Sequence, residues 1–216
     1  MKPGEKPTVP LYARSLVYLI RPFPNFDFSF VRPVRRLAVN LLALTPGDRV
    51  LDAGCGTGGS FPYLVEAVGT TGHVVGVEIS PETCANTRRR IESNKWQNVE
   101  LINAPAQTAK LSGKFDGLLM FAAPDVYASD EALDNIFPYL NDGARLVFFG
   151  AKVPDTRRGK TLGRVLQRIF AAISTDVPHI EPAPWHTLEK RIGDIEVKEY
   201  FFGLMFLASG KLNCSE

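Results

Sequence analysis

The apolar positions of the chain fall into two kinds of segment that alternate along the middle of the sequence. Short apolar runs bounded by turn-forming residues are typical of buried strands, and the longer segments between them carry apolar residues at helical spacing. The predicted strands are Arg49–Asp52, His73–Glu78, Asn98–Asn103, Phe115–Phe121 and Arg145–Gly150, and the predicted helices between them are Phe61–Val68, Ser80–Asn94 and Asp130–Leu140. This alternation predicts an α/β fold with a doubly wound parallel sheet.

The C-terminal part of the chain departs from this alternation. A short helix is predicted over Trp185–Ile192, and two strands follow over Ile195–Phe202 and Leu204–Ser209. Only Gly203 separates these strands, and a connection that short joins antiparallel strands. We therefore expect a seven-stranded sheet that ends in a C-terminal antiparallel hairpin. Earlier in the chain, Asn141–Gly143 is the predicted stop of the helix Asp130–Leu140.

Three further segments have helical spacing outside this core. They are Leu11–Ile20, Phe30–Leu44 and Gly159–Ile173. In the last segment apolar residues lie on one helical face and arginines on another, which is typical of a lid helix packed on the core or of a helix lying on an anionic membrane.

Composition and charge narrow the cellular setting and the partners. The formal net charge of +2 does not indicate a general affinity for nucleic acid. Three cysteines form no spaced framework, which fits a reducing compartment. No apolar run approaches the ~20 residues that a membrane span needs, and the N-terminal residues do not form a secretory signal. We therefore expect a cytoplasmic protein, with peripheral membrane contact as the alternative.

The glycine-rich stretch Val50–Gly59 carries the first chemical signal. Gly54, Gly56 and Gly59 match the dinucleotide pattern G-x-G-x-x-G, whereas Gly54, Gly56 and Gly58 match a different loop. Glu78 ends the next strand, 20 residues after Gly58, at the usual distance for an acid that binds ribose hydroxyls. Both dinucleotides and S-adenosylmethionine (SAM) carry such a ribose.

Asp52 separates these two ligands. It lies two residues before Gly54, beside the loop that would hold a pyrophosphate. Two like charges about 4 Å apart repel by about 4 kcal/mol at an effective dielectric constant near 20. Asp52 therefore opposes a pyrophosphate and favours SAM, whose sulfonium and ammonium groups are positive.

These motifs together resemble those of the class I SAM-dependent methyltransferases. Val50–Gly58 is similar to the signature loop of that family, and Val74–Ser80 is similar to its second motif. Lys114–Met120 resembles the fourth strand, and Leu140–Val147 resembles the entry into the fifth. The final hairpin also matches. The resemblance implies a Rossmann-like fold, methyltransferase activity and SAM as the cofactor.

The resemblance also implies a domain organisation and a set of cofactor-binding residues. Residues 1–44 would form a tail and a helical cover, and residues 45–216 the methyltransferase domain with residues 151–184 as a lid insert. The third motif departs from the family because Asn103–Gln107 holds no acid, so the Ala106 N–H or the Gln107 amide is expected to contact adenine. The implied cofactor-binding residues are Asp52, Gly54, Cys55, Gly56, Gly58, Glu78, Ile79, Ala106 and Phe121. No metal site is predicted.

The acceptor side offers three catalytic candidates. Asp125 follows the fourth predicted strand and is either a substrate-facing acid or a helix cap. Tyr18 either closes over the methionine part of SAM or packs, and His179 is either a base or a solvated loop histidine.

The nature of the acceptor follows from indirect signals. The run Ala122–Asp125 differs from the Asn/Asp-Pro-Pro-Tyr/Phe motif of DNA and glutamine methylating relatives, which argues against nucleic acid. Phe23, Phe26, Phe28 and Phe30 add an apolar lining near the N-terminal cover. We therefore expect a small, apolar or amphiphilic acceptor, as in the quinone and phospholipid methyltransferases.

Three alternatives remain at this stage. They are a phospholipid-amine N-methyltransferase at a membrane surface, a non-catalytic SAM-binding partner subunit, and a nicotinamide-dependent oxidoreductase. The oligomeric state is not indicated.

Overall fold

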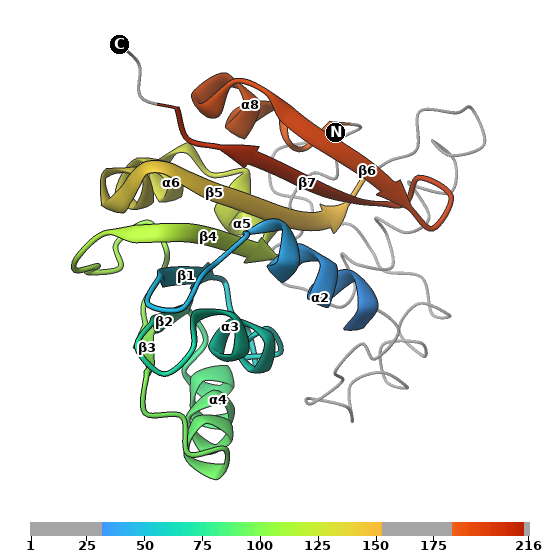
Figure 1. The fold of residues 1–216 in the computed structure, drawn as a ribbon. Coiled ribbons are helices and arrows are strands. Elements are labelled where there is room, and N and C mark those ends of the chain that lie inside the picture. The colour runs from blue at the N-terminus through green and yellow to red at the C-terminus, as the bar shows by residue number, and fades with distance from the viewer. Residues whose placement is uncertain (1–31, 153–182, 214–216) are drawn as a thin grey trace, which may run out of the picture.

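The computed structural model describes residues 32–152 and 183–213 (Figure 1). The predicted helices Leu11–Ile20 and Gly159–Ile173 lie outside these residues, as do the candidates Tyr18 and His179 and the phenylalanines near the N-terminus. Within the described ranges, no helix is long and apolar enough to cross a membrane.

A single seven-stranded sheet forms the centre of the fold. Its strand order is β3-β2-β1-β4-β5-β7-β6, and β7 is antiparallel to both of its neighbours, β5 and β6 (Figure 1). The other neighbouring pairs are parallel. The prediction of a doubly wound sheet with a C-terminal antiparallel hairpin is confirmed. The strands are β1 (Arg49–Ala53), β2 (His73–Glu78), β3 (Val99–Asn103), β4 (Phe115–Phe121), β5 (Leu140–Ala151), β6 (Ile195–Tyr200) and β7 (Met205–Lys211).

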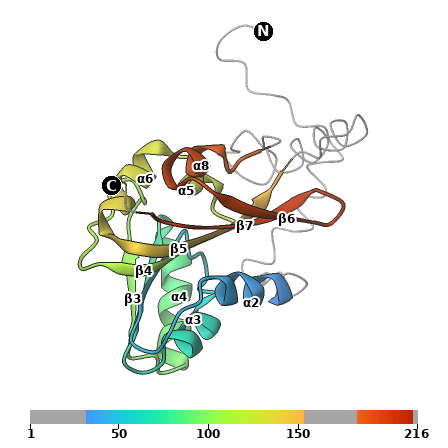
Figure 2. The same ribbon diagram turned by 45° about the horizontal axis from the view of Figure 1, so that its top comes forward.

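Helices cover both faces of the sheet and bury two apolar clusters against it (Figure 2). One face carries α2 (Arg32–Leu41), α3 (Phe61–Val68) and α4 (Pro81–Ser93). The other face carries α5 (Pro124–Tyr127), α6 (Asp130–Ile136) and α8 (His186–Ile192), with the short 3₁₀ helix η2 (Phe137–Tyr139) after α6. The strands between these layers are mostly buried on both faces, which explains their continuous apolar runs.

The fifth strand begins earlier than the sequence pattern predicts. Asn141–Gly143 does not end a helix but lies inside β5, which starts at Leu140. The register with β4 jumps between Phe115 and Gly117, so the extra residues form an irregularity within the paired strand. Gly143 adopts a φ of 79°, and its N–H donates to the Leu212 carbonyl at 2.9 Å. The glycine therefore bends a strand here, where the sequence indicated a helix stop.

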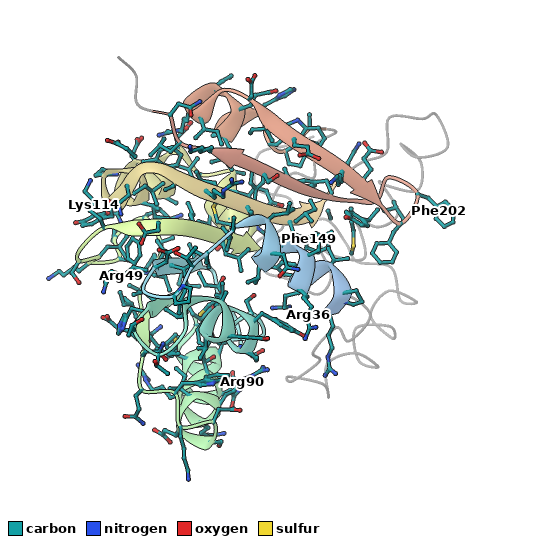
Figure 3. The ribbon with its side chains drawn as sticks, in the orientation of Figure 1. Arg36, Arg49, Arg90, Lys114, Phe149 and Phe202 are labelled. Carbon is teal, nitrogen blue, oxygen red and sulfur yellow. The ribbon has the colours of Figure 1, made fainter. Side chains whose placement is uncertain are left out.

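Two other boundaries also differ from expectation. The helix predicted to begin at Asp130 changes to 3₁₀ form at Phe137, because Pro138 lacks the N–H that an α-helix would use. Strand β6 ends at Tyr200 and β7 begins at Met205, so Phe201 and Phe202 lie in the turn between them, with φ values of 50° and 59°. The Phe202 side chain is fully exposed and projects from the hairpin tip (Figure 3). Bulky residues are uncommon in this left-handed region. The apolar run alone therefore predicted a strand here and not a turn.

Candidate active site

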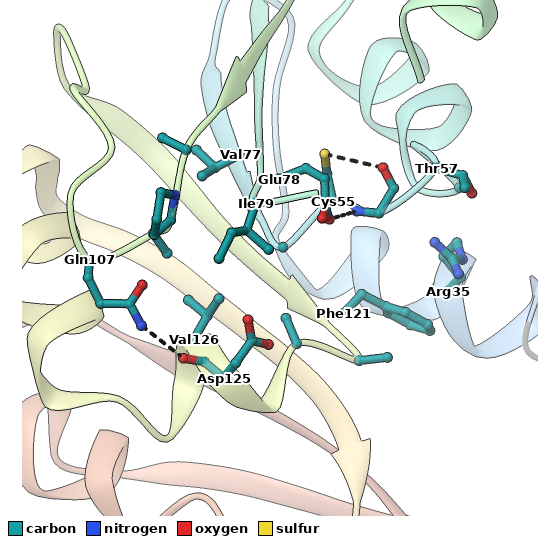
Figure 4. Close-up of a pocket in the computed structure, with 18 residues that line it drawn as sticks. Arg35, Cys55, Thr57, Val77, Glu78, Ile79, Gln107, Phe121, Asp125 and Val126 are labelled. Carbon is teal, nitrogen blue, oxygen red and sulfur yellow. Dashed lines mark hydrogen bonds between the residues drawn. The ribbon is translucent and has the colours of Figure 1, made fainter. Parts of the chain in front are cut away.

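A cavity of about 370 Å³ opens at the carboxyl ends of β1, β2 and β4 (Figure 4). The neighbouring strands β1 and β4 lie where the strand order reverses, which is the usual ligand position in a doubly wound sheet. The volume lies within the range of small-ligand sites. The lining residues are Arg35, Gly54, Cys55, Gly56, Thr57, Gly59, Val77, Glu78, Ile79, Ala104, Pro105, Ala106, Gln107, Phe121, Ala122, Ala123, Asp125 and Val126.

The glycine loop turns sharply from β1 into α3, and its three special positions are Gly54, Gly56 and Gly58. Their φ values are 78°, 55° and 71°, whereas Gly59 has no positive φ. A Cβ on Gly54 would lie 2.5 Å from the Cβ of Ala123, and one on Gly58 would lie 2.8 Å from the Phe61 ring. Packing therefore requires glycine at both positions.

Gly56 is different because a Cβ there would meet nothing within 4 Å. Gly56 lines the cavity, so the open space above it is space for a ligand. Because glycine has no side chain, that ligand can approach the backbone closely. Glycine also adopts the positive φ of this position without strain.

This contrast gives a prediction about two substitutions. Gly56→Asn is expected to leave the fold intact, because asparagine tolerates the left-handed region, but to weaken ligand binding at least about tenfold by occupying the open space. Gly54→Asn is expected to lower the melting temperature, because its Cβ clashes with Ala123. Calorimetric titration and thermal melting of both variants separate the effects. Equal loss of stability in the two variants would contradict the assignment.

Glu78 faces the glycine loop from the end of β2. The Gly56 N–H donates to one carboxylate oxygen at 3.1 Å (Figure 4). The Ser80 N–H donates to the other at 2.8 Å. The Asn103 amide donates to the backbone carbonyls of Glu78 and Ile79 at 2.9 and 3.0 Å and fixes the end of the strand. The carboxylate is thus held at the edge of the cavity, where it can accept hydrogen bonds from paired hydroxyls.

Asp52 lies beneath the loop and does not line the cavity. Its side chain is buried, and neither carboxylate oxygen has a hydrogen-bond partner among the described residues. Burial raises the pKa of Asp52 to about 7, although the positive charge of Arg35 lowers it, and the charge of Glu78 adds to the increase. When it is ionised, a buried carboxylate without hydrogen-bond partners stabilises positive charge nearby.

The segment after β3 closes the opposite end of the cavity. The Asn135 amide donates to the carbonyls of Ala106 and Ala109 at 2.8 and 3.0 Å and holds this segment in place. The Ala106 N–H has no hydrogen-bond partner among the described residues, so it is available to a ligand. The Gln107 amide makes long contacts to the Asp125 carbonyl and the Ser129 hydroxyl, at 3.5 and 3.4 Å.

Comparison with known proteins decides the family. Residues 44–171, more than half of the chain, match the family model of a methyltransferase domain. The chain belongs to the class I SAM-dependent methyltransferases. The family resemblance seen in the sequence is thereby confirmed, and SAM is its cofactor.

Individual relatives act on different acceptors. Aklanonic acid methyltransferase DauC from Streptomyces sp. strain C5 is 29% identical over 128 residues, which are 58% of this chain and 58% of DauC. Ribosomal RNA small subunit methyltransferase B from Pseudomonas syringae pv. tomato is 28% identical over 187 residues, which are 73% of this chain and 42% of that protein. The chain therefore spans less than two thirds of the length of these relatives. The N-methyltransferase NodS from Bradyrhizobium japonicum, 16% identical, has the same fold, with a TM-score of 0.61 over 87% of this chain and 98% of NodS.

The described residues of this methyltransferase fit SAM in one direction along the cavity. Glu78 suits the ribose hydroxyls and the segment at Ala106 suits adenine, which leaves the methionine part to the side lined by Gly59 and Phe121. The unpartnered Asp52 lies under that side, and Gly56 leaves room for the ligand. In this family SAM supplies the methyl group.

The cavity brings together most of the residues that the sequence indicated. Gly54, Cys55, Gly56, Glu78, Ile79, Ala106, Phe121 and Asp125 all line it, whereas Asp52 and Gly58 lie behind the wall. Burial, together with the charges of Asp52 and Glu78, raises the pKa of the Cys55 thiol, so it stays neutral and does not act as a nucleophile.

Sequence reasoning missed Arg35. It lines the cavity from α2, although it precedes every family motif. The available signal was its place on the apolar face of a helix, where Ala38 and Val39 follow three and four residues later and are buried.

Proposed function

We propose that this methyltransferase transfers the methyl group of SAM to a small, apolar or amphiphilic acceptor. The observation that carries the proposal is the chemistry at the carboxyl ends of β4 and β5. There the rings of Phe121 and Phe149 stack with centroids 4.5 Å apart, and Ala122 and Ala123 follow. Of this group, Phe121, Ala122 and Ala123 line the cavity, and these described residues offer apolar contact area and no hydrogen-bonding side chain for a nucleobase or a peptide amide.

The backbone at the end of β4 supports an acceptor site at this place. Ala122 adopts a φ of 58°, and its N–H donates to the Phe149 carbonyl at 2.8 Å. A non-glycine residue in this region is strained, and such strain clusters at functional sites. The Ala122 side chain is small and exposed, and it lines the cavity.

Among the described residues, the acidic side chains that line the cavity are Glu78 and Asp125. Asp125 lies in the first turn of α5, is exposed and lines the cavity (Figure 4). An acceptor hydroxyl or carbon acid needs a base, whereas a neutral amine needs chiefly alignment and exclusion of water. In this proposal Asp125 orients or deprotonates the acceptor, and Phe121 excludes water.

A labelled-methyl screen tests the proposal. The full chain is incubated with methyl-labelled SAM and separate sets of quinols, phenols, small amines, phospholipids and ribosomal RNA. We expect transfer to members of the small apolar sets and none to RNA. Transfer to ribosomal RNA alone would contradict the proposal, and the sequence similarity to an rRNA methyltransferase makes that arm necessary.

The hairpin tip favours a second candidate, an amphiphilic acceptor held at a membrane surface. Phe202 is fully exposed at the tip, next to the carboxyl end of β5 in the sheet (Figure 3). An exposed aromatic side chain of this kind can enter the interface of a bilayer. Cosedimentation with vesicles of anionic phospholipid at low and high salt tests it, with Phe202→Ser as the variant. Absence of the unmodified chain from the pellet at both salt concentrations would exclude this candidate.

A further inference from the structure

Thr87 is one of four polar side chains that are buried in the described part of the chain, and it contacts the glycine loop from α4. Its hydroxyl donates to the Gly56 carbonyl at 2.8 Å. A Cβ on Gly58 would lie 3.2 Å from the Thr87 methyl group, so the same side chain also packs against the turn of the loop. No residue of α4 lines the cavity. Thr87 therefore supports the loop from outside the ligand space.

The Thr87 hydroxyl has one proton and two carbonyl oxygens within reach, that of Gly56 at 2.8 Å and that of Thr83 at 2.9 Å. Thr83 lies four residues earlier in α4, so its carbonyl already accepts the Thr87 N–H of the helix. The only other donor to the Gly56 carbonyl among the described residues is the Cys55 thiol at 3.7 Å, and a thiol is a weak donor. The Gly56 carbonyl thus depends on the hydroxyl more than the Thr83 carbonyl does.

This hydrogen bond fixes the direction of the peptide group that joins Gly56 to Thr57. In a trans peptide the C=O and the N–H point in opposite directions, and the described chain has no cis peptide bond. Because the Gly56 carbonyl points to α4, the Thr57 N–H points away from α4. Thr57 lines the cavity, and its N–H has no hydrogen-bond partner among the described residues (Figure 4). The N–H of Gly56 is held separately, by the Glu78 carboxylate at 3.1 Å.

We propose that Thr87 is a positioning residue for the cofactor. Its hydroxyl holds the peptide between Gly56 and Thr57 in the orientation that presents the Thr57 N–H to bound SAM, although Thr87 itself does not touch the ligand. The loop needs this support because glycine adopts positive and negative φ with similar ease, so Gly56 alone does not select one orientation. The proposal rests on the assignment of SAM to this cavity and is independent of the acceptor.

Substitutions at position 87 separate the hydroxyl from the shape of the side chain. Thr87→Val keeps the branched shape without the hydroxyl, Thr87→Ser keeps the hydroxyl without the methyl group, and Thr87→Ala lacks both. Thr83→Val is the matched control, because it makes the same change one turn earlier in α4, where the hydroxyl has no hydrogen bond with the glycine loop and the residue lies outside the cavity lining. Circular dichroism melts establish that each variant is folded.

Calorimetric titration measures the Kd of SAM and of its demethylated product, S-adenosylhomocysteine (SAH). We expect Thr87→Val to weaken the binding of both ligands about 5- to 20-fold, because a carbonyl without its donor no longer fixes the peptide. Thr87→Ser should stay within about threefold of the unmodified chain and bind at least about threefold more tightly than Thr87→Ala. Thr83→Val should keep the affinity of the unmodified chain.

An unchanged Kd in Thr87→Val would refute the role of the hydroxyl. Equal losses in Thr87→Ser and Thr87→Val would also refute it, because the packing of the side chain against Gly58 would then account for the effect. If Thr87→Val did not fold, the comparison of Thr87→Ser with Thr87→Ala would decide the question in the same way. If the unmodified chain bound neither SAM nor SAH, the cofactor assignment itself would fail and this proposal with it.

Discussion

Glu78→Ala is expected to weaken the binding of SAM and of SAH by the same factor, about 1–3 kcal/mol or roughly 5- to 150-fold in Kd. In the proposed cofactor site the carboxylate accepts hydrogen bonds from the ribose hydroxyls, which the two ligands share, and such charge-assisted bonds are among the stronger ones. The substitution also leaves the Gly56 N–H without its acceptor, so the loop loses part of its fixed geometry. Calorimetric titration measures both effects in Kd.

The control for this variant is Glu82→Ala. Glu82 is an exposed residue in the first turn of α4, four positions further along the chain and outside the cavity. We expect it to keep the affinity of the unmodified chain, and Glu78→Gln to lose less affinity than Glu78→Ala because one acceptor oxygen remains. An unchanged Kd in a folded Glu78→Ala variant would contradict the ribose assignment.

Asp52→Asn is expected to stabilise the ligand-free protein at pH 8 while weakening SAM binding. The pKa of Asp52 is about 7 in the folded chain against an ordinary value of 3.8. The folded state therefore keeps the proton between about pH 4 and 7, while the unfolded state releases it. The free energy of unfolding accordingly falls by about 4 kcal/mol as the pH rises through this window. Above pH 7 the destabilisation is fully present.

Asparagine removes this ionisation, so the variant should gain about 1–3 kcal/mol over the unmodified chain at pH 8 and almost nothing at pH 4.5. The gain is smaller than the full 4 kcal/mol because a buried amide without partners also has a cost. Urea unfolding at the two pH values measures it, with Asp142→Asn, an exposed position in β5, as the control. A gain of the same size at both pH values would contradict the raised pKa.

The expected effect of Asp52→Asn on SAM binding is the opposite of its effect on stability, and it tests Asp52 as a cofactor-binding residue. The affinity of the unmodified chain for SAM should rise between pH 6 and 8 as Asp52 ionises, and Asp52→Asn should remove this rise and lower the affinity about tenfold at pH 8. A destabilised acid that is kept for binding follows the usual exchange of stability for function.

The glycine loop and Glu78 could be predicted because both belong to short motifs that can be recognised in the local sequence. The glycine loop and Glu78 each follow a strand whose carboxyl end must lie at the switch point, so strand order alone brings them to one edge. The choice of Gly58 over Gly59 as the third loop glycine also agrees with the φ values.

The remainder depends on tertiary packing, which the apolar pattern does not encode. Arg35 reaches the cavity only because α2 packs against the sheet beside α3, and no spacing rule links a helix before the first strand to the glycine loop. The start of β5 at Leu140 depends on pairing with Phe115 and on the bend at Gly143. The absence of partners for the Asp52 oxygens among the described residues can likewise be seen only once the surrounding side chains are placed.

The most direct test of the central claim is calorimetric titration of the full chain with SAM, with SAH and with NADH. The structure predicts micromolar binding of SAM and SAH and none of NADH, because Asp52 opposes a pyrophosphate while the glycine loop and Glu78 accept a ribose. Binding of NADH without binding of SAM or SAH would contradict the assignment of this cavity to a methyltransferase cofactor.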